Sequence, residues 1–168
     1  RKPRQLPDFD LAETCALHDF VMLTANVCTL HPAELRRSRT KQHCGSTHRM
    51  IMLDELFWQA HARVVCVQES RIQSDGYHLG CHYRMYRSSA DETGNYGVQI
   101  WIAHALAGLV TAVIAHSPRL LEVVMQVGPF YIHFFSAHAP TEDAPPEERD
   151  TFWVQLQVTG DNVAAGGP

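Results

Sequence analysis

At residues 64 to 69 the chain contains the run Val64-Val65-Cys66-Val67-Gln68-Glu69, in which four apolar residues precede two polar ones. A short apolar run rich in β-branched residues and bounded by polar ones is typical of a buried strand. A carboxylate at the C-terminal end of such a strand is placed to bind a hard divalent cation, because Mg²⁺ prefers oxygen ligands. The run therefore predicts a buried strand with Glu69 at its exit.

Two other predicted strands also deliver a polar side chain where they end. One is the run Phe20-Val21-Met22-Leu23-Thr24-Ala25-Asn26, which ends in an amide, and the other covers residues 130 to 137 and leads to the imidazole of His138. Three strand exits that each carry one polar group predict a shared pocket above a sheet. The alternative is that Glu69 only ends a strand or begins a turn.

The elements around these strands predict a mixed α/β protein. Apolar residues at three- and four-residue intervals predict a helix over residues 47 to 62, with Thr47 as its N-cap, so the chain opens with a βαβ-like unit. After Gly76 the pattern changes to short strands separated by turn residues, which is typical of an antiparallel sheet. We expect these strands at residues 77–79, 82–87, 96–103, 109–115, 120–127 and 130–137, followed by a helix over 147–158.

Four motifs in this order resemble those of the endonuclease/exonuclease/phosphatase superfamily, whose best-known member type is deoxyribonuclease I. They are Thr24-Ala25-Asn26-Val27-Cys28-Thr29-Leu30, Val67-Gln68-Glu69-Ser70, Gly97-Val98-Gln99-Ile100-Trp101-Ile102 and Ser136-Ala137-His138-Ala139-Pro140-Thr141. The retrotransposon-type and craniofacial-development-protein-like members are the most similar branch. The resemblance implies a four-layered αββα sandwich, an Mg²⁺ (or Mn²⁺) cofactor and a phosphodiester substrate in nucleic acid.

The resemblance also implies a role for each strand-exit residue. Glu69 would be the main metal ligand, and Asn26 would bind the scissile phosphate and join the metal site. His138 would assist at the phosphate or the leaving group. These three are the predicted catalytic residues, with Glu69 and Asn26 as the predicted metal site.

The chain departs from the family pattern in two places. Cys28 stands where many members have an acid, and the later Gly-Asp-x-Asn and Ser-Asp-His motifs have no match. The nearest match, Gly160-Asp161-Asn162, lacks the spacer residue. We therefore expect a lead-in at residues 1–17, a partial domain at 18–160, weakly active or inactive alone, and a flexible tail at 161–168. The alternatives are a degenerate module that binds without cutting and a phosphatase of inositol phosphates or lipids.

Composition limits the class of protein. The chain has 168 residues, 45% of them hydrophobic and 19% charged, which is ordinary for one globular domain. The formal net charge of −4 excludes the overall basic field of a typical nucleic-acid-binding module. Basic residues do gather between Arg36 and Lys41, where a solvated loop and a phosphate contact are both consistent with the sequence.

The five cysteines show no Cys-x-x-Cys spacing, which favours a reducing, intracellular setting, with a nuclear address left open. No stretch approaches the length of apolar sequence that crosses a membrane, so we expect no membrane partner. The sequence leaves the oligomeric state open.

Overall fold

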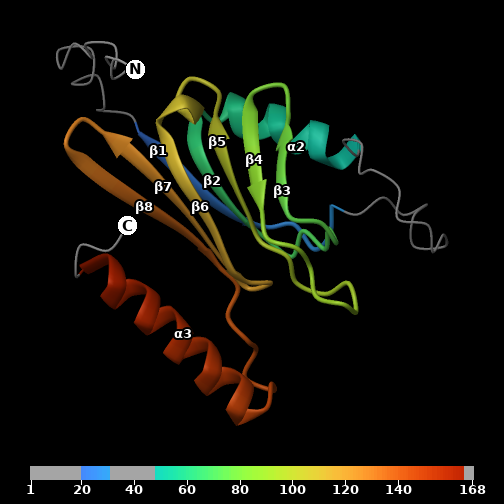
Figure 1. Cartoon of the computed structure of the whole chain (residues 1–168). Coiled ribbons are helices and arrows are strands. Elements are labelled where there is room, and N and C mark those ends of the chain that lie inside the picture. Colours follow the sequence, from blue (N-terminus) through green and yellow to red (C-terminus); the bar gives the residue numbers. More distant parts are fainter. Residues whose placement is uncertain (1–19, 31–47, 165–168) are drawn as a thin grey trace.

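The computed structural model describes residues 20–30 and 48–164, and in these it contains two β-sheets packed face to face. A helix at His48–Gln59 lies against the outer face of the first sheet, and a helix at Pro146–Ala164 extends beyond the end of the second (Figure 1). The predicted mixed α/β architecture with two stacked sheets is therefore confirmed. Both sheets end near the same region of the molecule, and the candidate site lies at these strand ends.

The first sheet has five strands in the order β1-β2-β5-β4-β3. Strands β1 and β2 are parallel and are joined through helix α2, as the predicted βαβ-like opening requires. The other neighbouring pairs are antiparallel. The bounds are β1 Val21–Asn26, α2 His48–Gln59, β2 Ala62–Gln68, β3 Gly76–Leu79, β4 Tyr83–Arg87 and β5 Gln99–Ala103.

The second sheet is an antiparallel meander in the order β6-β7-β8. Its strands are β6 Val110–Ser117, β7 Leu120–Val127 and β8 Phe130–Ala137, and a short 3₁₀ turn, η3 Ala107–Leu109, precedes β6. The turns at Ser117-Pro118 and Gly128-Pro129 separate the strands. The last two strands have the bounds that the sequence predicts, because turn residues mark both of their ends.

Two apolar cores hold these layers together. One lies between α2 and the first sheet and includes Met50, Phe57, Val65 and Trp101. The other lies between the two sheets. Its fully or nearly fully buried members are Val64, Cys66, Tyr86, Val98, Ile100, Ile102, Leu121, Val123, Met125 and Phe134. Strand β2 contributes alternate residues to both cores, which explains why its sequence is a continuous apolar run.

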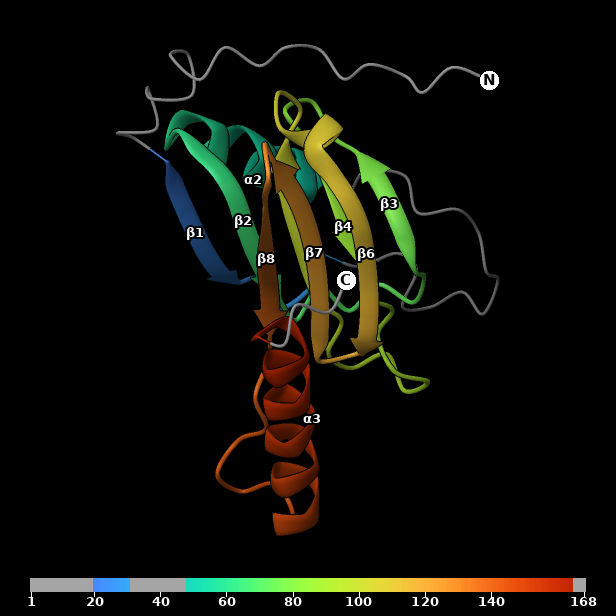
Figure 2. The same ribbon diagram turned by 60° about the vertical axis from the view of Figure 1, so that its left-hand side comes forward.

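Helix α3, Pro146–Ala164, extends from the end of the second sheet (Figure 2). Gln155 Nε2 donates a hydrogen bond to the carbonyl oxygen of His116 and fixes the helix to the end of β6. The sequence predicts a helix to residue 158 and a tail from 161, but α3 continues to Ala164. Gln157 supports the added turn, because its Nε2 donates to Asp161 Oδ1 at 2.8 Å.

The predicted helix over residues 47 to 62 is too long at its C-terminal end. Helix α2 stops at Gln59, and His61 has a left-handed backbone with φ of 58°, so that β2 starts at Ala62. Thr47 and the basic residues from Arg36 to Lys41 lie outside the described residues. In residues 20–30 and 48–164 no helix is both long and apolar enough to cross a membrane.

Candidate functional site

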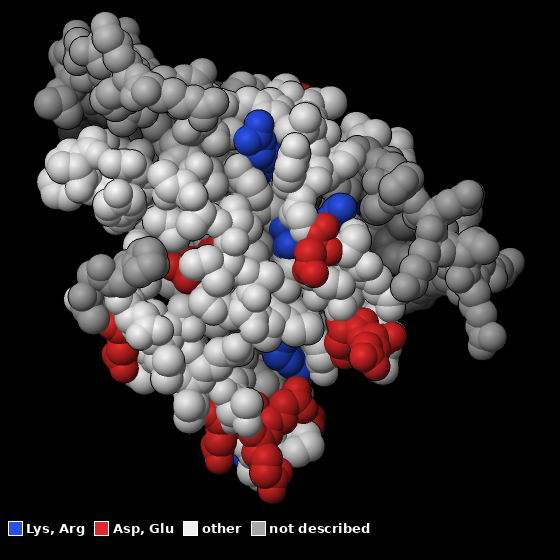
Figure 3. All heavy atoms as spheres, in the orientation of Figure 1, with Lys and Arg blue, Asp and Glu red and all other residues white. Residues whose placement is uncertain are grey.

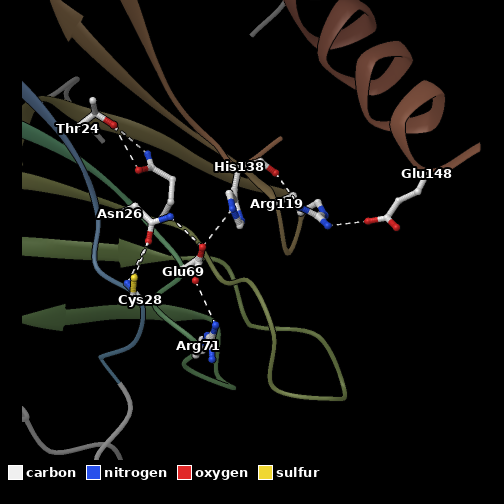
Figure 4. Close-up of polar contacts among 9 residues, drawn as sticks. Thr24, Asn26, Cys28, Glu69, Arg71, Arg119, His138 and Glu148 are labelled. Carbon is white, nitrogen blue, oxygen red and sulfur yellow. Dashed lines mark hydrogen bonds and ion pairs between the residues drawn. The ribbon is translucent and has the colours of Figure 1, made fainter. Parts of the chain in front are cut away.

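The three predicted residues meet at the ends of β1, β2 and β8 (Figure 4). Asn26 Nδ2 donates a hydrogen bond of 2.8 Å to Glu69 Oε1. His138 Nε2 lies 3.6 Å from the same carboxylate oxygen. The structure thus brings the amide, the carboxylate and the imidazole together around Glu69.

Parallel pairing of β1 and β2 brings Asn26 to Glu69. Asn26 is the register partner of Gln68, so its side chain reaches the next residue along β2. Glu69 then turns out of the strand with a left-handed backbone, φ of 56°. Such a backbone is uncommon for a residue with a Cβ, and it aims the carboxylate across the strand ends.

Gly97 lets a second segment pass close beneath this turn. Its φ is 77°, and a Cβ there would lie 2.8 Å from Ser70 Oγ and 3.2 Å from the backbone nitrogen of Arg71. The carbonyl oxygen of Gly97 accepts a hydrogen bond from the Ser70 N–H, so the backbone on either side of Glu69 is fixed. Only glycine fits both the space and the conformation.

The environment of Glu69 favours its ionised form. The hydrogen bond from Asn26 is the largest influence, and with Arg71 and His138 it holds the pKa of this carboxyl below its ordinary value, against a smaller effect of burial. The side chain is 22% exposed, so it remains open to solvent.

Burial shifts the pKa of His138 downward, whereas burial alone would shift the pKa of the Glu69 carboxyl upward. Removal of the ring from water lowers the pKa of His138, and the nearby Arg119 and Arg71 add to this, although the charge of Glu69 opposes it. The imidazole is therefore neutral at neutral pH and available to accept a proton. Its backbone is fixed by Arg119: the His138 N–H donates to the Arg119 carbonyl oxygen, and Arg119 Nη1 donates to the His138 carbonyl oxygen.

Three further residues at the site are absent from the sequence prediction. Arg71, Arg119 and Tyr96 line the same pocket as Glu69 and His138, whose volume is about 380 Å³. The Arg119 guanidinium lies 3.6 Å from the centre of the Tyr96 ring and 2.6 Å from Glu148 of α3. The available sequence signals are the position of Arg71 two residues after Glu69 and that of Arg119 directly before a predicted strand. The other lining residues are Asn95, Ala139, Thr141, Asp143, Ala144 and Glu148.

Two acidic side chains besides Glu69 line this pocket, Asp143 and Glu148. Glu147 precedes Glu148 in the first turn of α3 and lines a second pocket that shares Tyr96 and Arg119. Figure 3 shows acidic residues gathered at the lower end of the molecule, around the start of α3, with few basic residues among them. A polyanionic ligand would meet repulsion here unless cations screened it.

Glu69 is the carboxylate at the point where Asn26 and His138 meet. Among the described residues, no group of three His, Cys, Asp or Glu side chains is placed to hold a metal ion. Asn26 Oδ1 accepts a hydrogen bond from the Cys28 N–H at 3.1 Å, so Asn26 turns its nitrogen toward the carboxylate. Glu69 is therefore the oxygen ligand that this arrangement offers, and Mg²⁺ is commonly held by one or two carboxylates, waters and substrate oxygens.

Asn95, Trp101 and Asp161 lie away from the carboxylate or make their side-chain hydrogen bonds with other residues. Asn95 lines the pocket and donates to Thr93 Oγ1. Trp101 is buried in the core under α2, where its Nε1 donates to Gln99 Oε1. Asp161 lies in α3 and is hydrogen-bonded to Gln157, so it sits in a helix and not on an apolar strand.

Comparison with protein-family models gives no match, and no curated protein matches the sequence. Among solved structures, the chain is similar to the endonuclease domain of TRAS1, a telomere-specific non-LTR retrotransposon. That alignment has a TM-score of 0.46 and 16% sequence identity, and it covers 81% of this chain and 51% of the other. The chain thus spans about half the length of that endonuclease-domain chain.

Proposed function

We propose that the chain carries the metal-binding part of a phosphodiester-hydrolysing site of the endonuclease/exonuclease/phosphatase type, with nucleic acid as its substrate. The observation that supports this proposal best is the meeting of Asn26, Glu69 and His138 at one carboxylate oxygen. The same three residues carry the family resemblance in the sequence, and they come from segments far apart in the chain.

Glu69 would hold Mg²⁺ or Mn²⁺ through its ionised carboxylate, with Asn26 fixing the direction of that carboxylate. Such an ion, when bound, offsets charge on the phosphoryl oxygens and lowers the pKa of a bound water. His138, neutral at neutral pH, would exchange a proton with the attacking or leaving oxygen. Arg71 and Arg119 add two positive charges to the pocket, and of the two Arg71 is the one that could contact an anionic phosphate, because Arg119 is held by His138 and Glu148.

Calorimetric titration of the chain with Mg²⁺ and Mn²⁺ tests the metal site. We expect saturable binding that Glu69→Gln abolishes, because the amide keeps the shape of the side chain and removes its charge. Thr24→Ala is the control. Thr24 lies on the same face of β1 as Asn26, and its hydroxyl contacts Gln68, the neighbour of Glu69, so the variant disturbs the same strand ends without touching the carboxylate. Equal binding by wild type and Glu69→Gln would refute the metal site.

Plasmid nicking tests the chemistry. We expect weak or negligible cleavage by this chain alone, because no Gly-Asp-x-Asn or Ser-Asp-His motif is present in its sequence. Robust cleavage that Glu69→Gln abolishes would contradict this expected inactivity while supporting the site itself. DNA binding without any metal binding would favour the degenerate module, and hydrolysis of inositol phosphates alone would favour the phosphatase alternative.

A further inference from the structure

The second carboxylate oxygen of Glu69 is already paired with a cation of the chain itself. Arg71 Nη2 lies 3.2 Å from Glu69 Oε2, whereas Asn26 and His138 both approach Oε1 (Figure 4). The side chain of Arg71 is 33% exposed and that of Glu69 is 22% exposed, so this ion pair faces the open pocket. A divalent cation that binds Glu69 meets this guanidinium.

We propose that Arg71 competes with the divalent cation for Glu69, and that cation binding releases the Arg71 guanidinium to bind a phosphate oxygen in the pocket. The inference rests on the proposed function, because it concerns the same carboxylate. It adds a role for one residue: Arg71 would couple the binding of the metal to the binding of the anionic substrate.

Electrostatic repulsion supports the competition. A guanidinium and a divalent cation that share one carboxylate would lie within a few ångströms of each other, where like charges repel strongly even near a protein surface. The guanidinium also occupies the lone pairs of Oε2 that the cation needs. Removal of the Arg71 charge should therefore tighten cation binding by about tenfold.

The backbone of Arg71 is fixed by a hydrogen bond, whereas its side chain is 33% exposed and its guanidinium is hydrogen-bonded to Glu69. The Arg71 N–H donates a 2.9 Å hydrogen bond to the Tyr96 carbonyl oxygen, and its φ of 55° is set by the same tight turn as Glu69. Its Nε is buried and has no hydrogen-bond partner among the described residues, so the pairing with Glu69 leaves one donor unsatisfied. Rotation away from Glu69 therefore loses one bond and can gain a better-satisfied arrangement on a phosphate.

Arg119 is not free to act in the same way. Its guanidinium is bound to the His138 carbonyl oxygen and to Glu148, and one face lies on the Tyr96 ring. Of the two arginines that line the pocket, Arg71 is the one whose guanidinium is hydrogen-bonded to a single side chain among the described residues. Arg71 is thus the cation that can exchange partners.

Calorimetric titration with Mn²⁺ tests the competition in four chains: wild type, Arg71→Met, Arg71→Lys and Arg63→Met. We expect about tenfold tighter binding for Arg71→Met and near wild-type binding for Arg71→Lys, which keeps the charge. Arg63→Met removes the same charge at the other end of β2, where the guanidinium lies over Trp58, and should leave the affinity unchanged. Circular dichroism checks that each variant is folded.

A fluorescein-labelled phosphorothioate DNA duplex tests the coupling by fluorescence anisotropy with and without Mn²⁺. We expect Mn²⁺ to tighten DNA binding in wild type, and this gain to shrink about fivefold in Arg71→Met, because coupling between two ligands is reciprocal. Wild-type Mn²⁺ binding with equal or weaker binding by Arg71→Met overturns the inference and leaves the proposed function intact. An absence of Mn²⁺ binding in wild type overturns both.

Discussion

Asn26 Nδ2 donates a 2.8 Å hydrogen bond to Glu69 Oε1 across a separation of 43 residues in the sequence. The other end of the amide is also engaged, since Oδ1 accepts from the Cys28 N–H at 3.1 Å. With both ends used, the amide has one orientation, nitrogen toward the carboxylate. Asn26 thus serves Glu69 by fixing the position of its carboxylate and favouring its ionised form.

Replacement of Asn26 by alanine should weaken Mn²⁺ binding about tenfold, because partners that orient a metal ligand commonly contribute that much to metal affinity. Calorimetric titration measures the change. Thr24→Ala, two residues earlier on the same exposed face of β1, should bind Mn²⁺ as wild type does. Equal affinities of Asn26→Ala and Thr24→Ala would show that the amide does not support the site.

The left-handed backbone at Glu69 gives a prediction about stability that does not depend on any ligand. Glu69→Gly should be more stable than Glu69→Ala by about 1 kcal/mol, because glycine adopts a φ of 56° without the Cβ penalty. Urea denaturation measures both variants. At Thr24, in an extended strand, the order should reverse, with alanine more stable than glycine. The same order at both positions would argue against strain at Glu69.

Much of the fold can be predicted from the sequence because its turns carry strong signals. The bounds of β7 and β8 agree with the prediction to the residue, since Ser117-Pro118 and Gly128-Pro129 mark where the strands begin and end. The exits of β1, β2 and β8 follow from the same reasoning. The convergence of Asn26 and Glu69 then depends on parallel pairing, which the βαβ-like order of elements predicts.

The rest of the site depends on backbone conformations that leave no mark in the sequence. Cys28, Glu69, Arg71 and Tyr96 all have left-handed backbones, yet none is glycine, the residue that usually signals such a turn. These turns aim the side chains of Arg71 and Tyr96 into the pocket. The role of Arg119 also could not be predicted. Its contacts with Tyr96, His138 and Glu148 join residues that lie far apart in the sequence, and no local pattern in the chain indicates that they meet.

Asp54 gives a prediction about pH. Burial raises the pKa of this carboxyl above its ordinary 3.8, although His82 and the backbone of Cys81 oppose the shift. Between 3.8 and the raised folded value, the folded chain binds more protons than the unfolded chain, so stability falls as the pH rises through that window. Asp54→Asn has no carboxyl to ionise at this position, so its free energy of unfolding should exceed that of wild type by about 1 kcal/mol at neutral pH.

Urea denaturation of wild type and Asp54→Asn over a range of pH measures the difference, which should narrow as the pH falls toward 3.8. The neighbouring Glu55 serves as a control, because its pKa is shifted in the opposite direction to that of Asp54. A hydrogen bond from His82 lowers the pKa of Glu55, so its ionised form stabilises the fold at higher pH. Glu55→Gln should therefore lose stability relative to wild type as the pH rises. A difference between Asp54→Asn and wild type that does not change with pH would rule out the buried charge as its cause.

The outer face of the second sheet contains a buried carboxylate between two imidazoles. Glu122 on β7 lies 2.8 Å from His116 Nε2 and 2.6 Å from His133 Nδ1, and its side chain is only 3% exposed. Each carboxylate oxygen thus accepts from one ring, and the three residues join all three strands of the sheet. Loss of the carboxylate would leave two ring donors without this acceptor, one on His133, which is 8% exposed, and one on the more open His116, which is 22% exposed.

Glu122→Ala should therefore lose about 3 kcal/mol of unfolding free energy, from the unsatisfied rings and the cavity together. Glu122→Gln should lose about 1 kcal/mol, because its oxygen still accepts from one ring and its nitrogen can donate to the other ring in the alternative tautomer. Gln126→Ala is the matched control on the same strand, since Gln126 is less buried and its side chain donates a hydrogen bond to the Gly128 carbonyl oxygen. Chemical denaturation measures all three. A loss in Glu122→Ala no larger than in Gln126→Ala would mean that the two histidines find other partners, and that the carboxylate does not hold the three strands together.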